Sequence, residues 1–214
     1  MKFNKILFLS NGESVLFDWL LDIGEDVQIT SFPITSEYIN IHGIDFLVSY
    51  GYRHLIAQEV LDLLSGKAIN LHISLLPWNR GADPNLWSFI GNTPKGVTIH
   101  YINNTLDAGD IIFQKEVEFE IESETLRTSY EKLHQEVQKL FKDNWHNLKI
   151  GKNSKFPQIG EGSFHKSIDK DLLNGLLVKG WDTSVRNLEE FSAENEFSSQ
   201  FIKNLLNKIG RAHV

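Results

Sequence analysis

The chain has 214 residues, which is enough for one domain of ordinary size and a small appendage. Its 41% hydrophobic and 23% charged residues are typical of a soluble globular protein, and no apolar run approaches the roughly 18 residues of a membrane helix. The net charge of -7 argues against nucleic acid as a partner, because binding a phosphate backbone needs a concentrated basic face. The absence of cysteine excludes disulfides and thiolate metal sites and favours a cytoplasmic location.

Strand-like and helix-like patterns alternate through the first third of the chain. Short apolar runs predict buried strands, and apolar residues at helical spacing predict helices that end at glycine. This alternation predicts an open, doubly wound and mostly parallel α/β sheet, because parallel strands need crossover helices. The predicted strands cover residues 4–10, 27–32, 45–49 and 69–74, and the predicted helices cover residues 15–23 and 55–64.

The second half of the chain predicts the end of the sheet and a small C-terminal part. A long helix is expected to begin at Ser123 or Glu124, with one apolar stripe and Gly151 as its C-terminal breaker. At residues 152–162 the composition shifts to glycine, asparagine, proline and charged residues, which indicates a boundary or an ordered linker. We therefore expect a main domain at residues 1–150 and a small segment at 151–208. The other elements expected here are helices at 84–90, 169–177 and 183–191, and strands at 97–102 and 111–119.

The strand that ends before Pro77 carries its polar side chains on one face. Asn70, His72 and Ser74 alternate with isoleucine and leucine, so a β-strand points all three the same way. The first two are about 7 Å apart, close enough to hold opposite sides of one reacting carbonyl. The carboxyl end of such a strand is where ligands bind in α/β sheets. The residues alone are equally compatible with two hydrogen-bonded polar side chains that have no catalytic role.

Other polar segments also have an ordinary structural interpretation. Residues 107–110 read Asp-Ala-Gly-Asp, which is typical of a hairpin turn, and Asp110 is expected to be a turn residue. Residues 78–84 and 49–54 follow strands and are either turns or binding loops; Gly51, between two tyrosines, would let the main chain approach a flat ligand. Residues 11–14 hold one glycine and a carboxylate, which argues against a dinucleotide site.

One set of motifs is specific when it is taken in chain order. It consists of Asn70, His72, residues 74–77, Arg80, Gly81, Pro84, Trp87, residues 96–98, His100 and residues 106–110. With these motifs the chain resembles the formyltransferases that use 10-formyltetrahydrofolate. Within that family, the sequences LPWNRGADPNLWSF and PKGVTIH look most like those of sugar N-formyltransferases.

The resemblance implies an enzyme with a Rossmann-like formyltransferase core, the catalytic domain being residues 1–150. The family's catalytic trio falls on Asn70, His72 and Asp107. The implied reaction needs no metal: a neutral amine attacks the formyl carbon, and Asn70 and His72 hold the oxyanion. Asp107 orients His72 and moves protons through water.

The resemblance also implies two binding regions. The acceptor would be the amine of a nucleotide-linked amino sugar, such as a dTDP-4-amino-4,6-dideoxyhexose, made for surface polysaccharides such as O-antigen. Ser74, Trp78, Asn79 and Arg80 are expected on the sugar side. The pterin of the co-substrate 10-formyltetrahydrofolate is expected against Tyr50, Gly51, Tyr52, Arg53, His54, Leu55, Ile56, Asn104 and Asp110, largely through main-chain groups.

Other functions fit the sequence less well. Glycinamide ribonucleotide formyltransferases carry a phosphate-holding glycine-rich turn that residues 11–14 match poorly. Transfer of a formyl group to methionyl-tRNA is disfavoured by the charge of -7 and the lack of a long basic C-terminal domain. A folate- or nucleotide-binding module without catalysis remains an alternative from a different class, although all three catalytic residue types are present.

The C-terminal end has an unusual sequence. Residues 209–214, IGRAHV, coincide with what a common sequencing-adapter oligonucleotide would encode. We therefore expect a non-native tail at 209–214 and a truncated segment at 151–208. Sugar formyltransferases often carry a small β element for dimer contact at this end, so a homodimer is expected if the end is complete.

Overall fold

The computed structural model describes residues 3–173 and 175–194. The chain divides into two compact units, each discontinuous in sequence. Unit 1 consists of Met1–His72, Thr98–Gln114 and Val137–Gln158, and unit 2 consists of Ile73–Val97, Lys115–Glu136 and Ile159–Val214. The domain boundary after residue 150 stays a prediction, and the expected non-native tail lies outside the described residues.

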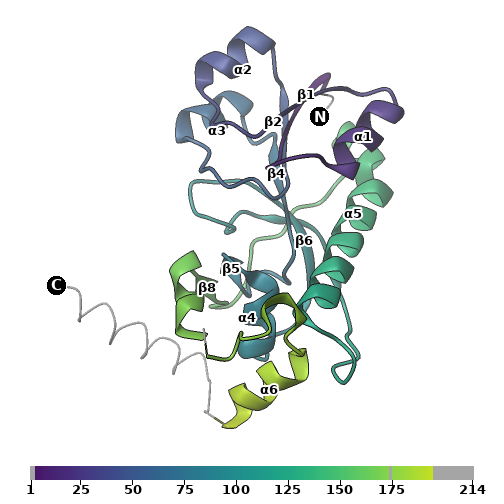
Figure 1. Cartoon of the computed structure of the whole chain (residues 1–214). Helices are drawn as coiled ribbons and strands as arrows, with labels where there is room; N and C mark the ends of the chain where they lie inside the picture. Colours follow the sequence, from purple (N-terminus) through teal and green to yellow (C-terminus); the bar gives the residue numbers. More distant parts are fainter. Residues whose placement is uncertain (1–2, 174, 195–214) are drawn as a thin grey trace, which may run out of the picture. The chain divides into compact units, whose positions relative to one another are not determined.

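A six-stranded sheet has the order β2-β1-β3-β4-β6-β7. The first four strands in this order are parallel, and β6 runs antiparallel to β4. This confirms the predicted open and mostly parallel α/β sheet (Figure 1). The strands are β1 (Lys5–Leu9), β2 (Asp26–Thr30), β3 (Phe46–Ser49), β4 (Ala68–His72), β6 (Gly96–Tyr101) and β7 (Ile111–Glu116).

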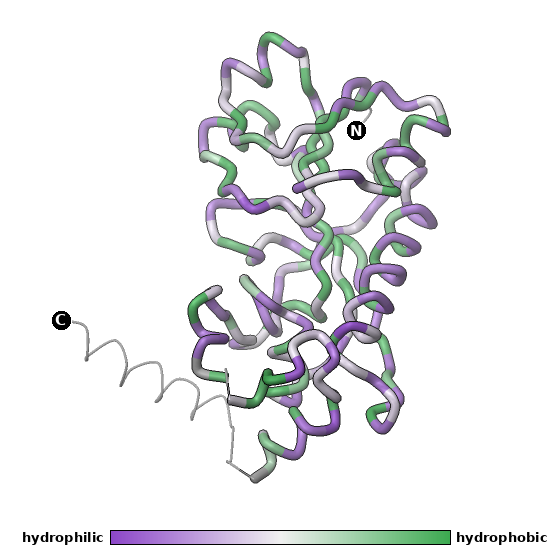
Figure 2. Tube along the Cα trace, in the orientation of Figure 1, coloured by the Kyte–Doolittle hydropathy of each residue, from purple (hydrophilic) through white to green (hydrophobic). Residues whose placement is uncertain are grey.

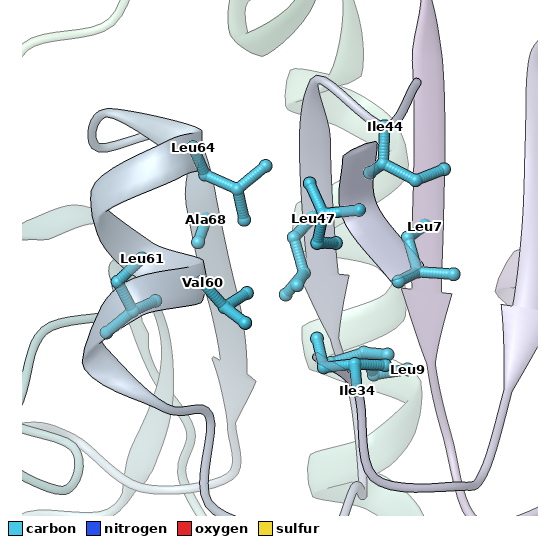
Figure 3. Close-up of a cluster of buried hydrophobic side chains, with 10 residues drawn as sticks. Leu7, Leu9, Ile34, Ile44, Leu47, Val60, Leu61, Leu64 and Ala68 are labelled. Atoms are coloured by element: carbon cyan, nitrogen blue, oxygen red, sulfur yellow. The ribbon is translucent and has the colours of Figure 1, made fainter. Parts of the chain in front are cut away.

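Helices of unit 1 cover both faces of the parallel strands. Figure 3 shows the face on which α3 (Gln58–Leu64) packs against strand side chains, and α2 (Ser36–His42) contributes Ile39 to the same cluster. On the opposite face, α1 (Val15–Asp22) and the second half of α5 (Leu126–Ile150) meet, with the rings of Trp19 and Phe141 6.1 Å apart. Both faces are buried, which explains the nearly continuous apolar runs of β1 and β3.

Unit 2 has its own small core around α4 (Pro84–Ile90) and α6 (Val185–Glu194). A two-stranded parallel ladder joins β5 (Arg80–Gly81) to β8 (Phe164–His165). A Cβ on Gly81 would lie 2.3 Å from the carbonyl oxygen of His165, so only glycine fits there. Two 3₁₀ segments, η1 (Ser167–Leu173) and η2 (Gly180–Asp182), complete the unit.

Most predicted elements are present with small shifts, but the helix expected at 169–177 is the 3₁₀ segment η1, and α2, η2 and the ladder of β5 and β8 were missed. The helix α2 is only seven residues long; Thr35 caps its start and Gly43 ends it in the left-handed conformation. The ladder of β5 and β8 has two residues in each strand, too few for a periodic pattern.

Figure 2 shows α5 mostly purple with short green stretches, in keeping with its single apolar stripe. Across residues 3–173 and 175–194, no helix is long and apolar enough to cross a membrane.

Candidate active site

The polar face of β4 meets β6 in an antiparallel register. Asn70 lies opposite His100, and His72 lies opposite Thr98. Opposite residues of an antiparallel pair point to the same face, so four polar side chains gather there. Asn70 and His72 lie two residues apart on β4 and so share a face, as predicted, but the strand ends at His72 and Ser74, predicted on the same face, lies outside it.

Asp107 reaches the same face from the loop between β6 and β7. Its carboxylate oxygen Oδ1 accepts a hydrogen bond from Asn70 Nδ2 at 3.2 Å, and Oδ2 lies 3.7 Å from His72 Nδ1. Asp107 is buried and has φ 52°, a left-handed conformation that costs a non-glycine residue about 1–3 kcal/mol, although aspartate tolerates it better than most. The fold therefore brings together the three residues that the sequence predicted as catalytic, and their catalytic role stays a prediction.

A second histidine belongs to this cluster, and the predicted site omitted it. His100 is buried, its Nε2 lies 3.3 Å from Asn70 Nδ2, and the same nitrogen lies 3.5 Å from Asp107 Oδ1. The other ring nitrogen, Nδ1, lies 2.8 Å from the carbonyl oxygen of Tyr101. A carbonyl oxygen only accepts hydrogen bonds, so Nδ1 carries a proton, and in the tautomer that has its single proton there Nε2 accepts from Asn70. His100 was among the family motifs, but nothing in its own strand indicated that it would lie opposite Asn70.

This arrangement can carry out acid–base chemistry. Asp107 is an acceptor for the Asn70 amide and a neighbour of two imidazoles, so protons can move among these groups. The contact of 3.7 Å between Asp107 Oδ2 and His72 Nδ1 is longer than a hydrogen bond and is within the range of an ion pair when His72 is protonated. Of the two ring nitrogens of His72, Nδ1 is the one that faces the Asp107 carboxylate.

Comparison with known proteins identifies the family. A family model described as formyl transferase matches residues 33–144, which include the whole polar cluster. The chain belongs to the formyl transferase family.

Curated members of the family that it matches include the phosphoribosylglycinamide formyltransferase of Bacillus subtilis. The two are 36% identical over 99 residues, which make up 46% of this chain and 50% of that protein. The methionyl-tRNA formyltransferase of Thermodesulfovibrio yellowstonii is 32% identical over 145 residues, 67% of this chain and 46% of that protein. The chain thus spans about half the length of these curated relatives.

Solved structures of formyl transferases resemble this chain over most of its length. A crystal structure of the formyltransferase PseJ from Anoxybacillus kamchatkensis, in complex with UDP-4,6-dideoxy-4-formamido-L-AltNAc and tetrahydrofolate, is 46% identical. The match covers 86% of this chain and 97% of that chain, with a TM-score of 0.82. A sugar N-formyltransferase from Shewanella is 24% identical, with a TM-score of 0.70 and coverage of 88% and 87%, and therefore supports the fold alone.

The residues predicted to line a pterin site lie in unit 1 of this formyl transferase. Tyr50 is buried and its hydroxyl accepts from Gln138 Nε2 at 3.0 Å, whereas Tyr52 donates to the carbonyl oxygen of Phe32 at 2.8 Å. Burial raises the pKa of Tyr52, so this hydroxyl stays a donor at neutral pH. The remaining predicted residues are Gly51, Arg53, His54, Leu55 and Asn104, which are exposed, Ile56, which is half-buried, and Asp110, which pairs with Lys155 at 3.1 Å.

The residues predicted for the sugar side lie in unit 2. Asn79 is fully buried: its Nδ2 donates to Thr93 Oγ1 at 2.8 Å, and its Oδ1 accepts from Ser163 Oγ at 3.1 Å. Ser74 is also buried, and it donates to the carbonyl oxygen of Trp78 at 2.7 Å. The side chains of Asn79 and Ser74 therefore stabilise the conformation of residues 74–80 through buried hydrogen bonds. Trp78 and Arg80 are half-buried, and sugar binding by any of the four stays a prediction.

Unit 2 also contains a cavity of about 270 Å³. Tyr130 and Trp181 form part of its wall, as do Lys170 and Asp83, which pair at 3.3 Å. Asn85 lines it as well and has a buried Oδ1 without a hydrogen-bond partner among the described residues. None of the residues predicted for catalysis, for the pterin or for the sugar contributes to this wall.

Proposed function

We propose that this protein transfers the formyl group of 10-formyltetrahydrofolate to the C4 amine of a nucleotide-linked 4-amino-4,6-dideoxyhexose. The observation that carries the proposal is the likeness to PseJ, which is 46% identical and whose structure holds a 4-formamido sugar nucleotide and tetrahydrofolate. That likeness extends over 97% of the PseJ chain, so it includes more than a shared folate-binding core.

The polar cluster supplies what such a reaction requires. Asn70 offers amide N–H groups and His72 offers a ring nitrogen, the two kinds of donor that stabilise an oxyanion. Asp107, 3.7 Å from His72 Nδ1, holds this ring in the tautomer whose Nε2 serves the reacting groups. Its carboxylate also takes up the proton that the attacking amine loses, either directly or through water. The expectation that no metal takes part stays a prediction.

The loop after β3 fits the co-substrate. Gly51 has φ +68°, and a Cβ built there would meet nothing within 4 Å, so the main chain is open to a flat ligand. Three exposed residues, Arg53 to Leu55, follow it. We assign the pterin to residues 50–56 together with Asn104 and Asp110. When bound there, 10-formyltetrahydrofolate supplies the activated formyl group.

The nucleotide is proposed to be a uridine diphosphate. The sequence motifs suggested a dTDP sugar, whereas PseJ is in complex with a UDP sugar. At 46% identity PseJ is a better guide to the acceptor than the relatives at 24% identity or below, which support the fold alone. The surface-polysaccharide pathway, the cytoplasmic location and the homodimer stay predictions.

Release of tetrahydrofolate, followed with purified protein, tests this function. The acceptors are a UDP-linked and a dTDP-linked 4-amino-4,6-dideoxyhexose, a dTDP-linked 3-amino sugar and glycinamide ribonucleotide. We expect the highest kcat/KM for the UDP-linked 4-amino sugar. A folded protein that turns over none of the amino sugars, or that prefers the 3-amino isomer, would contradict the proposal.

Formylation of glycinamide ribonucleotide is the second candidate. The 36% identity to the Bacillus subtilis enzyme favours it, although over only 99 residues. The turn after β1 argues against it, since Glu13 brings a carboxylate there and Ser14 Oγ already caps α1 by accepting from Leu16 N at 3.3 Å. A kcat/KM for glycinamide ribonucleotide above that for every amino sugar would establish this candidate instead.

A further inference from the structure

The segment that follows α5 is hydrogen-bonded to the loop that carries Asp107 and to the strands beside it. Composition predicted a boundary or an ordered linker at residues 152–162, and within this range residues 152–158 belong to unit 1 and are hydrogen-bonded to other parts of it. Phe156 and Ile111 form an isolated antiparallel bridge: the distance from Ile111 N to the Phe156 carbonyl oxygen is 2.8 Å, and that from Phe156 N to the Ile111 carbonyl oxygen is 2.9 Å. Asn153 Nδ2 donates to the Tyr101 hydroxyl at 2.9 Å.

Gln158 makes the most direct contact with the catalytic loop. Its Nε2 donates to the carbonyl oxygen of Asp107 at 2.8 Å and to that of Gly109 at 2.9 Å. A glutamine amide has two N–H donors, so one side chain satisfies both carbonyls at once. Gln158 is half-buried and lies 51 residues from Asp107 in the sequence.

The main chain of the loop at residues 107–109 is constrained, and a hydrogen bond that holds it would keep it in place. Asp107 is held at a positive φ, and Gly109 approaches Tyr101 so closely that a Cβ on it would lie 1.8 Å from the Tyr101 carbonyl oxygen. The Asp107 carboxylate must meanwhile keep its distances to Asn70 and His72. A main-chain shift of about 1 Å would break this geometry, and misplacement of that size costs about 100-fold in rate.

We propose that Gln158 is a positioning residue that holds the main chain of Asp107 and Gly109, and thereby aims the Asp107 carboxylate at Asn70 and His72. This inference rests on the proposed function, because it assigns Asp107 a part in formyl transfer. The two hydrogen bonds that Gln158 donates go to main-chain carbonyl oxygens, so it acts on the Asp107 carboxylate through the loop.

Gln158→Met removes both donors and keeps the side-chain length, so it is the primary variant. Asn144→Leu is its matched control: Asn144 Nδ2 also donates to a main-chain carbonyl oxygen, that of Leu140 at 2.8 Å, and both residues lie on α5. We expect Gln158→Met to lower kcat about 10- to 100-fold with a change in KM for the sugar below about 3-fold. Asn144→Leu should keep the wild-type kcat. A wild-type kcat in Gln158→Met would overturn the proposal.

Gln158→Glu provides a readout that a purely structural role would not give. A deprotonated carboxylate would face two carbonyl oxygens and repel both, whereas the protonated carboxyl can donate to one of them. The kcat of this variant relative to wild type should therefore rise as the pH falls. A ratio that is the same at every pH would contradict positioning by hydrogen-bond donation.

Amide hydrogen exchange separates this inference from the proposed function, because it needs no turnover. Amides in residues 104–110 should exchange about ten times faster in Gln158→Met than in wild type or Asn144→Leu, since the loop opens locally more often. If exchange is faster in Gln158→Met but the wild-type protein is inactive, the proposed function is refuted and the role of Gln158 in holding the loop is retained. Unchanged exchange, or faster exchange with an unchanged kcat, would refute the role of Gln158.

Discussion

The amide of Asn70 and the imidazole of His100 lie directly opposite each other on β4 and β6, with Nδ2 3.3 Å from Nε2. The same Nδ2 donates to Asp107 Oδ1 at 3.2 Å. Both partners are acceptors, which fixes the amide with its nitrogen toward them and its oxygen away. Both amide N–H groups are therefore committed in this state, so an oxyanion must replace one of these partners to be bound by Asn70.

His100→Phe should lower kcat about 10- to 100-fold, because the amide of Asn70 then loses the acceptor that fixes its orientation. The phenyl ring fills the same buried space, so the fold should be retained. Steady-state kinetics with circular dichroism checks both points. His42→Phe is the control, since His42 lies on α2 and contacts the ring of Tyr38 at 4.2 Å. A wild-type kcat in His100→Phe would show that Asn70 keeps its orientation without this ring.

Asp107→Asn should lower turnover by at least about 100-fold while the protein remains folded. The substitution keeps an oxygen for the Asn70 amide but removes the negative charge that faces His72 and His100. The measurement is kcat for tetrahydrofolate release together with thermal unfolding. Asp62→Asn, which changes an exposed carboxylate on α3, should leave both unchanged. Near-wild-type turnover in Asp107→Asn would remove this carboxylate from the mechanism.

Gly109→Ala should destabilise the protein by about 1–3 kcal/mol and lower activity. The added Cβ would lie 1.8 Å from the Tyr101 carbonyl oxygen, and because both groups belong to the main chain, the loop itself must move. Gly12→Ala is the matched control, as its Cβ would meet nothing within 4 Å. Urea unfolding compares the two variants. Equal free energies of unfolding would mean that the loop accommodates the methyl group without strain.

Local patterns predicted the parts of the site that lie within one element. The alternation of β4 was enough to place Asn70 and His72 on the same face, because side chains on a strand alternate with a period of two. The short helix α2 and the two-residue strands β5 and β8 were missed, since they contain too few residues for a periodic signal.

Contacts between segments that are distant in the sequence could not be predicted from the periodicity of single strands and helices. The place of His100 opposite Asn70 depends on the antiparallel register of β4 and β6, which neither strand specifies alone. Asp107 reads as a turn residue, and only the family resemblance marked it as catalytic. Gln158 sits in a segment whose composition indicated a linker, and no local signal connects it with a loop 51 residues earlier.

His165 should make the stability of the protein depend on pH. Its ring is stacked on that of Trp87, with centroids 4.2 Å apart, and its buried Nδ1 has no hydrogen-bond partner among the described residues. Burial lowers the pKa of His165 from 6.5 to about 4, and the nearby Asp169 only partly opposes this effect. Above pH 6.5 the ring is neutral in the folded and unfolded chains alike.

As the pH falls from 6.5 toward 4, the unfolded chain binds the proton first, so the free energy of unfolding decreases, by about 3 kcal/mol at most from this residue. His165→Phe keeps a ring against Trp87 and removes the titrating group. Denaturant unfolding at pH 7 and pH 4.5 should therefore show a smaller loss of stability in the variant than in wild type. An equal loss in both proteins would mean that His165 is solvated or protonated in the folded state, and that its stacking on Trp87 does not exclude the charged form.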